Sequence, residues 1–275
     1  MNELKYSVLM SVYYKEKPVY LKDCILSMLN QSILPDEIIV VRDGAVTEEL
    51  QFVLDELSNN NIIKIIELSE NVGLGKALSI GLNECKNELV ARMDTDDISN
   101  INRCEKQLEQ FKTDHNLSVL GTAVEEFIDE PRNVIAYKEV KITSEEINRQ
   151  MKYRNPMNHP TVMFKKSDVL KSGGYKHFYL NEDYYLWLRM MQLGFKFKNI
   201  DEPLVKMRVS DDTYQRRGGW NYFLNQKRLL DYMLNNKMLN IFEYMFNILV
   251  RLAIRVLIPN NVRKIFYLNI LRKRV

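Results

Sequence analysis

Short apolar runs recur along about the first hundred positions of the chain. Four of them lack a regular polar alternation, which predicts strands buried on both faces: residues 6–12 (YSVLMSV), 37–41 (EIIVV), 62–68 (IIKIIEL) and 88–93 (ELVARM). Between them, apolar residues at helical spacing predict helices over 20–32, 48–60 and 75–85. Thr47 is suited to cap the second helix. This alternation predicts an α/β fold with a mostly parallel central sheet and helices on both faces.

The pattern becomes less regular from about residue 118 to residue 201. Residues 118–128 and 159–167 each predict a strand, and the second leads into a helix from Ser167. The segment 181–194 (NEDYYLWLRMMQLG) predicts a helix with an acidic start, ended by Gly194. From residue 218 onward the chain predicts helices. We therefore expect further elements after the strand–helix alternation rather than a repeat of it.

Polar residues follow the predicted parallel strands at the points where they end. Tyr13, Asp43, Asn71 and Asp94 come after the four strands in turn. Ligands of open α/β sheets bind outside the carboxyl ends of the strands. We therefore expect these side chains to meet at one ligand-binding edge.

Composition and charge restrict the class of protein. The chain has 275 residues, 46% hydrophobic and 27% charged, which suits one large globular domain or a domain with an appendage. Three cysteines lie far apart without a CxxC pair, which disfavours disulfides or a zinc site and favours a reducing compartment. The N-terminus does not resemble a signal peptide, and no window of about twenty residues is free of charge, so we expect no membrane span.

The segment ARMDTDD places Asp94, Asp96 and Asp97 directly after the fourth strand. Carboxylates two residues apart can share Mg²⁺ or Mn²⁺, which bind hard oxygen ligands and the phosphates of a substrate. A simpler alternative is a solvated turn in which Asp97 or Ser99 caps the following helix. A calcium loop is disfavoured, because Ile98 and Ser99 occupy positions that need an acid or amide and a glycine.

The combination of SVLMSVYYKE, EIIVVRDG, NVGLGKALSIGL and ARMDTDD, followed by GGY and NEDYYLWLRM, resembles family 2 glycosyltransferases, which have the GT-A fold. The likeness covers about residues 5–205 and is greatest to bacterial enzymes of surface polysaccharide synthesis, of the amylovoran, O-antigen or capsule type. It implies a catalytic domain over 1–205, with a nucleotide-binding half over about 1–100 and an acceptor half over about 101–205. The remaining residues, 206–275, would form a helical, basic C-terminal region.

The resemblance also implies residue roles. Tyr13, Asp43, Lys76 and Asp94 would contact the nucleotide, while Asp94 and Asp96 would bind Mn²⁺ or Mg²⁺. Arg42 and Ala45 depart from the family pattern VDDGS, but Asp43 is retained. Two alternatives stay open: a structural turn aspartate for Asp43 and a solvated lysine for Lys76.

Glu182 and Asp183 open the helix predicted after the GGY turn. The resemblance implies that Asp183 is the catalytic base of an inverting transfer, although acids here can also only complement the helix dipole. Asn155, Glu182 and His159 are candidates for the acceptor pocket, with an ordinary hydrogen-bonded histidine as the alternative for the last. A loop carrying Arg208, Arg216 and Arg217 could close over a diphosphate or be a solvated connector. Its YQRRGGW is not the QxxRW of processive synthases.

The C-terminal region is basic and amphipathic. No acidic residue follows Glu243, whereas Arg and Lys recur to the end of the chain. Arg251 and Arg255 lie four apart, so we expect one helical face to place cations on lipid phosphates, with a helix packed on the catalytic domain as the alternative. The lack of a binding motif disfavours nucleic acid.

The resemblance, together with these features, implies an inverting, metal-dependent glycosyltransferase. Its expected donor is a nucleotide sugar, with a UDP-sugar favoured, and its expected acceptor is a polyprenyl-diphosphate-linked saccharide. We expect it in the cytoplasm, peripheral on the inner face of the plasma membrane, in surface polysaccharide synthesis. The alternative is a non-catalytic sugar-nucleotide-binding or scaffold protein on the same fold. A nucleotidyltransferase is disfavoured, because VYYKEKP has no glycine-rich phosphate loop after the first strand.

Overall fold

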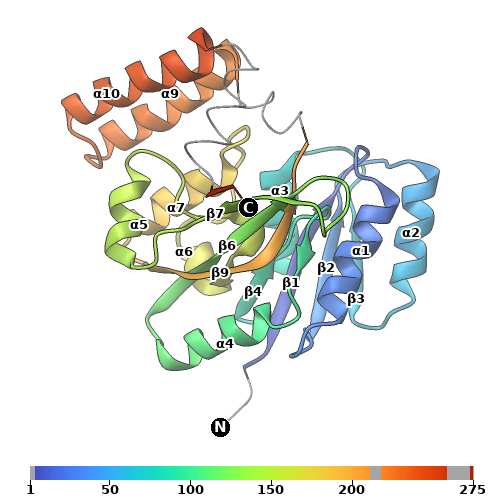
Figure 1. Cartoon of the computed structure of the whole chain (residues 1–275). Helices are drawn as coiled ribbons and strands as arrows, with labels where there is room; N and C mark the ends of the chain where they lie inside the picture. The colour runs from blue at the N-terminus through green and yellow to red at the C-terminus, as the bar shows by residue number, and fades with distance from the viewer. Residues whose placement is uncertain (1–3, 211–217, 259–272, 275) are drawn as a thin grey trace.

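The structure is a computed structural model that describes residues 4–210, 218–258 and 273–274. Its first half alternates strands and helices as predicted, and the strands pair in parallel in the order β4-β1-β2-β3 (Figure 1). The elements are β1 (Tyr6–Val12), α1 (Pro18–Leu29), β2 (Glu37–Arg42), α2 (Glu48–Ser58), β3 (Ile63–Glu67), α3 (Leu74–Glu84) and β4 (Leu89–Arg92).

The sheet continues beyond β4 with mainly antiparallel pairs. β8 joins β4 to β6, β7 lies on the far side of β6, and β9 runs parallel to β6 while also pairing with β5. The elements are β5 (Ile98–Ser99), α4 (Arg103–Thr113), β6 (Leu117–Phe127), β7 (Val134–Lys138), α5 (Ser144–Met151), the 3₁₀ turn η1 (His159–Thr161), β8 (Met163–Lys165), α6 (Lys166–Lys171), α7 (Glu182–Gln192) and β9 (Lys196–Arg208).

Helix ends follow the local chemistry of the sequence. The Thr47 side chain accepts a hydrogen bond from the Leu50 backbone nitrogen at 3.3 Å, which confirms it as the cap of α2. Pro18 opens α1, where its missing N–H costs no helical hydrogen bond. Gly194 follows α7 with a φ of 77°, in the left-handed region that favours glycine, and confirms the predicted helix stop.

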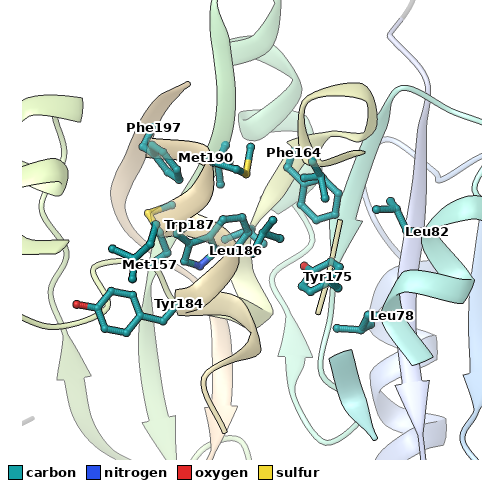
Figure 2. Close-up of a cluster of buried hydrophobic side chains, with 14 of the residues drawn as sticks. Leu78, Leu82, Met157, Phe164, Tyr175, Tyr184, Leu186, Trp187, Met190 and Phe197 are labelled. Carbon is teal, nitrogen blue, oxygen red and sulfur yellow. The ribbon is translucent and has the colours of Figure 1, made fainter. Parts of the chain in front are cut away.

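The two faces of the sheet carry separate hydrophobic clusters. One is formed with α1, α2 and α4, and the other with α3, α5, α7 and α9. Trp187 of α7 lies at the centre of the second cluster among Met157, Leu186 and Phe197 (Figure 2). Helices therefore cover both faces, as expected for the predicted α/β fold.

Two helices near the C-terminus pack as an antiparallel pair at one corner of the molecule (Figure 1). They are α9 (Trp220–Asn235) and α10 (Ile241–Leu252), the second extended by a π-helical turn η2 (Ala253–Leu257). β10 (Lys273–Arg274) pairs with β7. Leu229, Leu230 and Met233 of α9 join the cluster around Trp187. The boundary proposed at residue 205 lies inside β9, and the division into domains stays a prediction.

The expected arrangement of arginines on α10 is wrong. Arg251 faces the protein and is only 6% exposed, since its guanidinium donates hydrogen bonds to Gln226 and, at 3.0 Å, to the Tyr153 carbonyl. The Arg255 guanidinium lies 5.3 Å from the centroid of the Tyr222 ring on α9. The polar side of the helix is turned inward, so these two cations do not form a lipid-facing row.

The cysteines match the expectation of a chain without disulfides. Cys24, Cys85 and Cys104 are free and buried. Burial raises the pKa of each thiol above its ordinary value. Within the described ranges, no helix combines the length and apolar character needed to cross a bilayer.

Candidate active site

Asp43 fixes the edge of the sheet at the end of β2. Its two carboxylate oxygens accept hydrogen bonds from the backbone nitrogens of Val72 at 2.7 Å and Gly73 at 3.0 Å. Gly44 is required beside it, because a Cβ there would approach the Asn71 nitrogen to 2.7 Å. Asp43 therefore positions the start of α3, where Lys76 is exposed in the first turn. Asp43 therefore has the structural role of a turn aspartate, and its contact with a nucleotide stays a prediction.

The acidic turn after β4 begins with a paired carboxylate. Asp94 forms an ion pair with buried Arg92, yet its side chain is 39% exposed. Burial, followed by the charges of Asp94 and Glu16, raises the pKa of Asp96 to about 7. Negative charge is therefore concentrated in a partly buried turn, where water screens the repulsion between the carboxylates only weakly. A cation bound there would be stabilised.

Glu16 belongs to the same acidic group, although it is not among the site residues predicted from the sequence. It follows Tyr13 by three residues, and its backbone nitrogen donates to the Tyr13 carbonyl at 3.0 Å. The Thr95 hydroxyl donates to its carboxylate at 2.5 Å, and burial raises its pKa. An acid just after the end of β1 is the signal that could have found it, because all parallel strands of the first half end at this edge.

Asp97 is buried, so the acidic segment is not a solvated turn. One of its carboxylate oxygens accepts a hydrogen bond from the Arg208 backbone nitrogen at 2.8 Å, and the other has no hydrogen-bond partner among the described residues. The capping alternative is wrong: Ser99 lies in β5, and α4 begins after Asn102. The turn is instead held by β9.

Arg208 ends β9 and does not lie in a loop, so its predicted setting is wrong. Its Nε donates to the Asp96 carbonyl at 3.0 Å, and its guanidinium lies 3.7 Å from the Tyr20 ring centroid and 4.5 Å from that of Phe127. These contacts fix the backbone of the acidic turn. Arg216 and Arg217 lie outside the described residues.

The acidic turn has donors that fit a divalent cation completed by phosphate. No group of three or more His, Cys, Asp or Glu side chains in residues 4–210 and 218–258 is arranged to hold a metal unaided. Asp94 and Asp96 offer two hard carboxylates, and the partnerless buried oxygen of Asp97 lies in the same turn. Mg²⁺ commonly binds through one or two carboxylates and substrate phosphates, so these residues fit such a site.

Asp183, the proposed base, lies in the first turn of α7. The Asn155 side-chain amide donates to its Oδ2 at 2.6 Å, while Asn155 Oδ1 accepts from the Met157 nitrogen at 3.1 Å. These bonds hold the carboxylate in one orientation. Asn155, a candidate for the acceptor pocket, thus contacts the proposed base, and its place in the pocket stays a prediction.

Glu182 joins α7 to the start of α3. A Cβ at Gly75 would lie 2.9 Å from the Glu182 Cγ and 2.8 Å from the Lys176 carbonyl, so only glycine permits this close approach. The contact brings the segment bearing Lys76 next to the turn bearing Asp183. The predicted nucleotide and base regions are therefore adjacent.

Tyr175 and His159 lie between the acidic turn and α7. The His159 Nε2 and the Tyr175 hydroxyl form a hydrogen bond at 3.0 Å, and burial together with the nearby charge of Arg92 lowers the pKa of His159. Burial raises the pKa of Tyr175, and the charges of Asp183 and Asp94 raise it further. His159 opens the 3₁₀ turn η1 rather than a strand. It is an ordinary hydrogen-bonded histidine, as the structural alternative for this residue expects.

The folding stability should depend on pH through Glu182. Burial, reinforced by Asp183, raises its pKa from 4.5 to about 7. Because the folded pKa lies above the unfolded value, the stability is full below pH 4.5 and falls as pH rises through 7. We expect E182Q to remove this loss, on the order of 3 kcal/mol, when urea unfolding is compared at pH 5 and pH 8.

A matched control for this measurement is E145Q, at the exposed start of α5. It should leave the pH dependence of the wild type unchanged. Parallel pH dependences for E182Q and the wild type would mean that Glu182 is ionised in the folded protein without cost.

Comparison with known proteins agrees with this geometry. The sequence profile of glycosyl transferase family 2 matches residues 7–174. The chain is 37% identical to an Escherichia coli UDP-Gal:alpha-D-GlcNAc-diphosphoundecaprenol beta-1,3-galactosyltransferase, over 98% of this chain and 97% of the relative. It is also 37% identical to the amylovoran biosynthesis glycosyltransferase AmsE of Erwinia amylovora, over 95% and 97%. The solved S. aureus TarS 1–349 in complex with UDP-GlcNAc superposes with a TM-score of 0.67 and 16% identity, over 97% of this chain and 76% of that 1–349 chain.

The family match, the full-length relatives and the TarS fold together identify the class. The chain belongs to glycosyl transferase family 2 and has the GT-A fold. The predicted family, fold class and glycosyltransferase class are thereby confirmed. The roles of the individual site residues stay predictions.

Proposed function

We propose that the chain is a metal-dependent, inverting glycosyltransferase that moves a sugar from a UDP-sugar to a lipid-linked saccharide. The observation that carries this proposal is the carboxylate of Asp183, oriented by Asn155 in a helical turn that packs against the start of α3. A base and a cation-binding turn at one sheet edge are the two parts that a single displacement on a sugar diphosphate needs.

In the proposed reaction, Asp183 accepts the proton of an acceptor hydroxyl. The acceptor oxygen forms a bond to the anomeric carbon as the bond between that carbon and the diphosphate oxygen breaks, and the electron pair leaves with the diphosphate. Mg²⁺ or Mn²⁺ held by Asp94 and Asp96 would supply charge stabilisation to the leaving diphosphate. Because no covalent intermediate forms, the configuration at the anomeric carbon is inverted.

The remaining site residues serve binding in this proposal. On the donor side, Tyr13 contacts the base, Asp43 the nucleoside and Lys76 the edge of the nucleotide. Glu182, buried beside the base, and His159, half-buried and hydrogen-bonded to Tyr175, shape the acceptor side. Arg208 acts by holding the acidic turn rather than by closing over the diphosphate, because its donors meet backbone carbonyls.

The proposed acceptor is a polyprenyl-diphosphate-linked saccharide, used in capsule, O-antigen or exopolysaccharide synthesis. The E. coli relative is named for a diphosphoundecaprenol-linked acceptor, and the Erwinia relative for amylovoran biosynthesis. An enzyme with such an acceptor works at a membrane surface, so we place the protein peripherally on the inner face of the plasma membrane, attached through its C-terminal region.

Calorimetric nucleotide binding tests the donor site. UDP, GDP, dTDP and CDP are titrated with and without Mn²⁺ into the wild type and D96A. We expect UDP to bind only with metal, and D96A to weaken that binding at least about tenfold, because one of two carboxylate ligands is lost. The matched control D55N lies on exposed α2 and should bind as the wild type does.

Absence of metal-dependent nucleotide binding in the wild type would refute the proposed donor site. A non-catalytic sugar-nucleotide-binding or scaffold protein is the alternative, and it differs in one respect. Such a protein would bind UDP but would have no need of the Asn155–Asp183 bond, so N155A would change nothing measurable beyond stability.

A further inference from the structure

Helix α10 is amphipathic, but its apolar side faces away from the protein and its polar side faces inward. Its exposed side carries six large apolar residues, which we call the α10 apolar face: Ile241, Phe242, Met245, Phe246, Leu249 and Val250. Phe242 is 84% exposed. Asn247 and Arg251 are instead buried against the protein. A helix that only packed on the catalytic domain would bury its apolar side, so a further partner is indicated.

The helix is held in this orientation by polar contacts. The Asn240 and Glu243 side chains form a reciprocal capping box at its start, and Glu243 also pairs with Lys152 at 2.9 Å. At its other end, Arg251 donates to the Tyr153 carbonyl and to Gln226. Rotating the helix to bury its phenylalanines would break all of these bonds. The outward apolar face is therefore a fixed feature of the fold.

The neighbouring helix presents matching residues. Trp220, Leu224 and Arg228 are exposed at spacings of four along α9, which places them on one side of that helix. The start of α9 meets η2, the turn that extends α10, because the Gly219 nitrogen donates to the Arg255 carbonyl at 2.8 Å. An exposed tryptophan and an arginine on one side of a helix are typical of proteins that lie in a membrane interface.

We propose that the α10 apolar face inserts into the interface of an anionic lipid bilayer. This inference rests on the proposed function, since a membrane-held acceptor requires the enzyme at that surface. Charge favours lipid over a second copy of the chain: the two exposed charged side chains within residues 218–258, Arg228 and Lys237, are both basic, which suits anionic headgroups and disfavours self-association. The apolar residues, rather than Arg251 and Arg255, supply the lipid contact.

The inner side of α10 connects this surface to the proposed base. Arg251 contacts the carbonyl of Tyr153, two residues before Asn155, and also Gln226, whose amide donates to Asn181 Oδ1 at 2.5 Å. Asn181 directly precedes Glu182 and Asp183. One arginine therefore ties α10 to both segments that position the Asp183 carboxylate. Docking of α10 on lipid would hold the base at a fixed place relative to the membrane.

Vesicle co-sedimentation of the full chain tests the proposal. Vesicles contain phosphatidylethanolamine and phosphatidylglycerol, and the variants are F242E/F246E and, as a matched control, F52E, whose phenylalanine is 71% exposed on α2. We expect the wild type and F52E to sediment with the vesicles. The double variant should bind at least about tenfold more weakly, because two aromatic side chains lose their burial in lipid.

Three parallel readouts decide between outcomes. All variants should unfold at the same temperature, because the substituted residues are exposed. Equal unfolding temperatures exclude misfolding as the cause of a loss of vesicle binding. UDP binding that is unchanged in F242E/F246E separates this proposal from the donor site, whose failure would abolish UDP binding in every variant alike. Vesicle binding by F242E/F246E at the wild-type level overturns the proposal. A wild type that ignores vesicles but forms a dimer, which the double substitution dissociates by sedimentation velocity, overturns it in favour of a contact between copies.

Discussion

Asp183→Asn is expected to lower turnover by about 10²–10⁴-fold, the usual contribution of a general base. Asparagine has nearly the same shape and can offer its amide oxygen to the Asn155 Nδ2, which donates to Asp183 at 2.6 Å in the wild type. The geometry of the turn is thus preserved while the proton acceptor is lost. Single-turnover transfer from a radiolabelled UDP-sugar to a lipid-linked acceptor measures the effect.

Binding and control measurements give this result its meaning. UDP affinity should stay at the wild-type value, because Asp183 acts on the acceptor hydroxyl. The control D55N removes a carboxylate from exposed α2 and should turn over normally. Turnover by D183N within a few-fold of the wild type would exclude Asp183 as the base and direct attention to Glu182.

Trp187→Ala is expected to lower the free energy of unfolding by about 3–5 kcal/mol, as for other buried tryptophans cut to alanine. Trp187 is fully buried and lies near Phe197 (Figure 2). Its ring centroid is 6.2 Å from those of both Phe197 and His159. Nothing nearby can refill so large a volume without moving the helix. Urea unfolding followed by circular dichroism measures the loss.

The same substitution should affect the site, because Trp187 lies one helical turn after Asp183. We expect turnover to fall further than the folded fraction alone explains. The control F52A removes an exposed phenylalanine and should change stability by less than about 0.5 kcal/mol. A loss below 1 kcal/mol in W187A would mean that α7 is not anchored through this residue.

The first half of the fold could be predicted because one physical pattern repeats in it. Strands buried on both faces must be apolar throughout, and the predicted bounds of the first strand, residues 6–12, match β1. Parallel strands then bring their carboxyl ends to one edge, so Asp43 and Asp94 could be assigned to the site from their positions alone.

The remaining features depend on tertiary pairing that leaves little local pattern. β9 contains Asp201, Glu202 and Pro203 in its middle, and its register with β6 shifts there, so no alternation is visible in the sequence. The position of Glu16 after the end of β1 points to the sheet edge, but only the hydrogen bond from Thr95 joins it to the acidic turn. The orientation of α10 could not be deduced, because helical periodicity separates two faces without saying which one meets the protein.

The deep burial of all three cysteines has a practical consequence for labelling. A thiol reacts as its thiolate, and burial both raises its pKa and excludes reagents, so the native chain should behave toward maleimides as if it had no cysteine. A single cysteine introduced on the surface would then take a fluorophore at one known position. Probes could report distances within the working enzyme without first rebuilding its core.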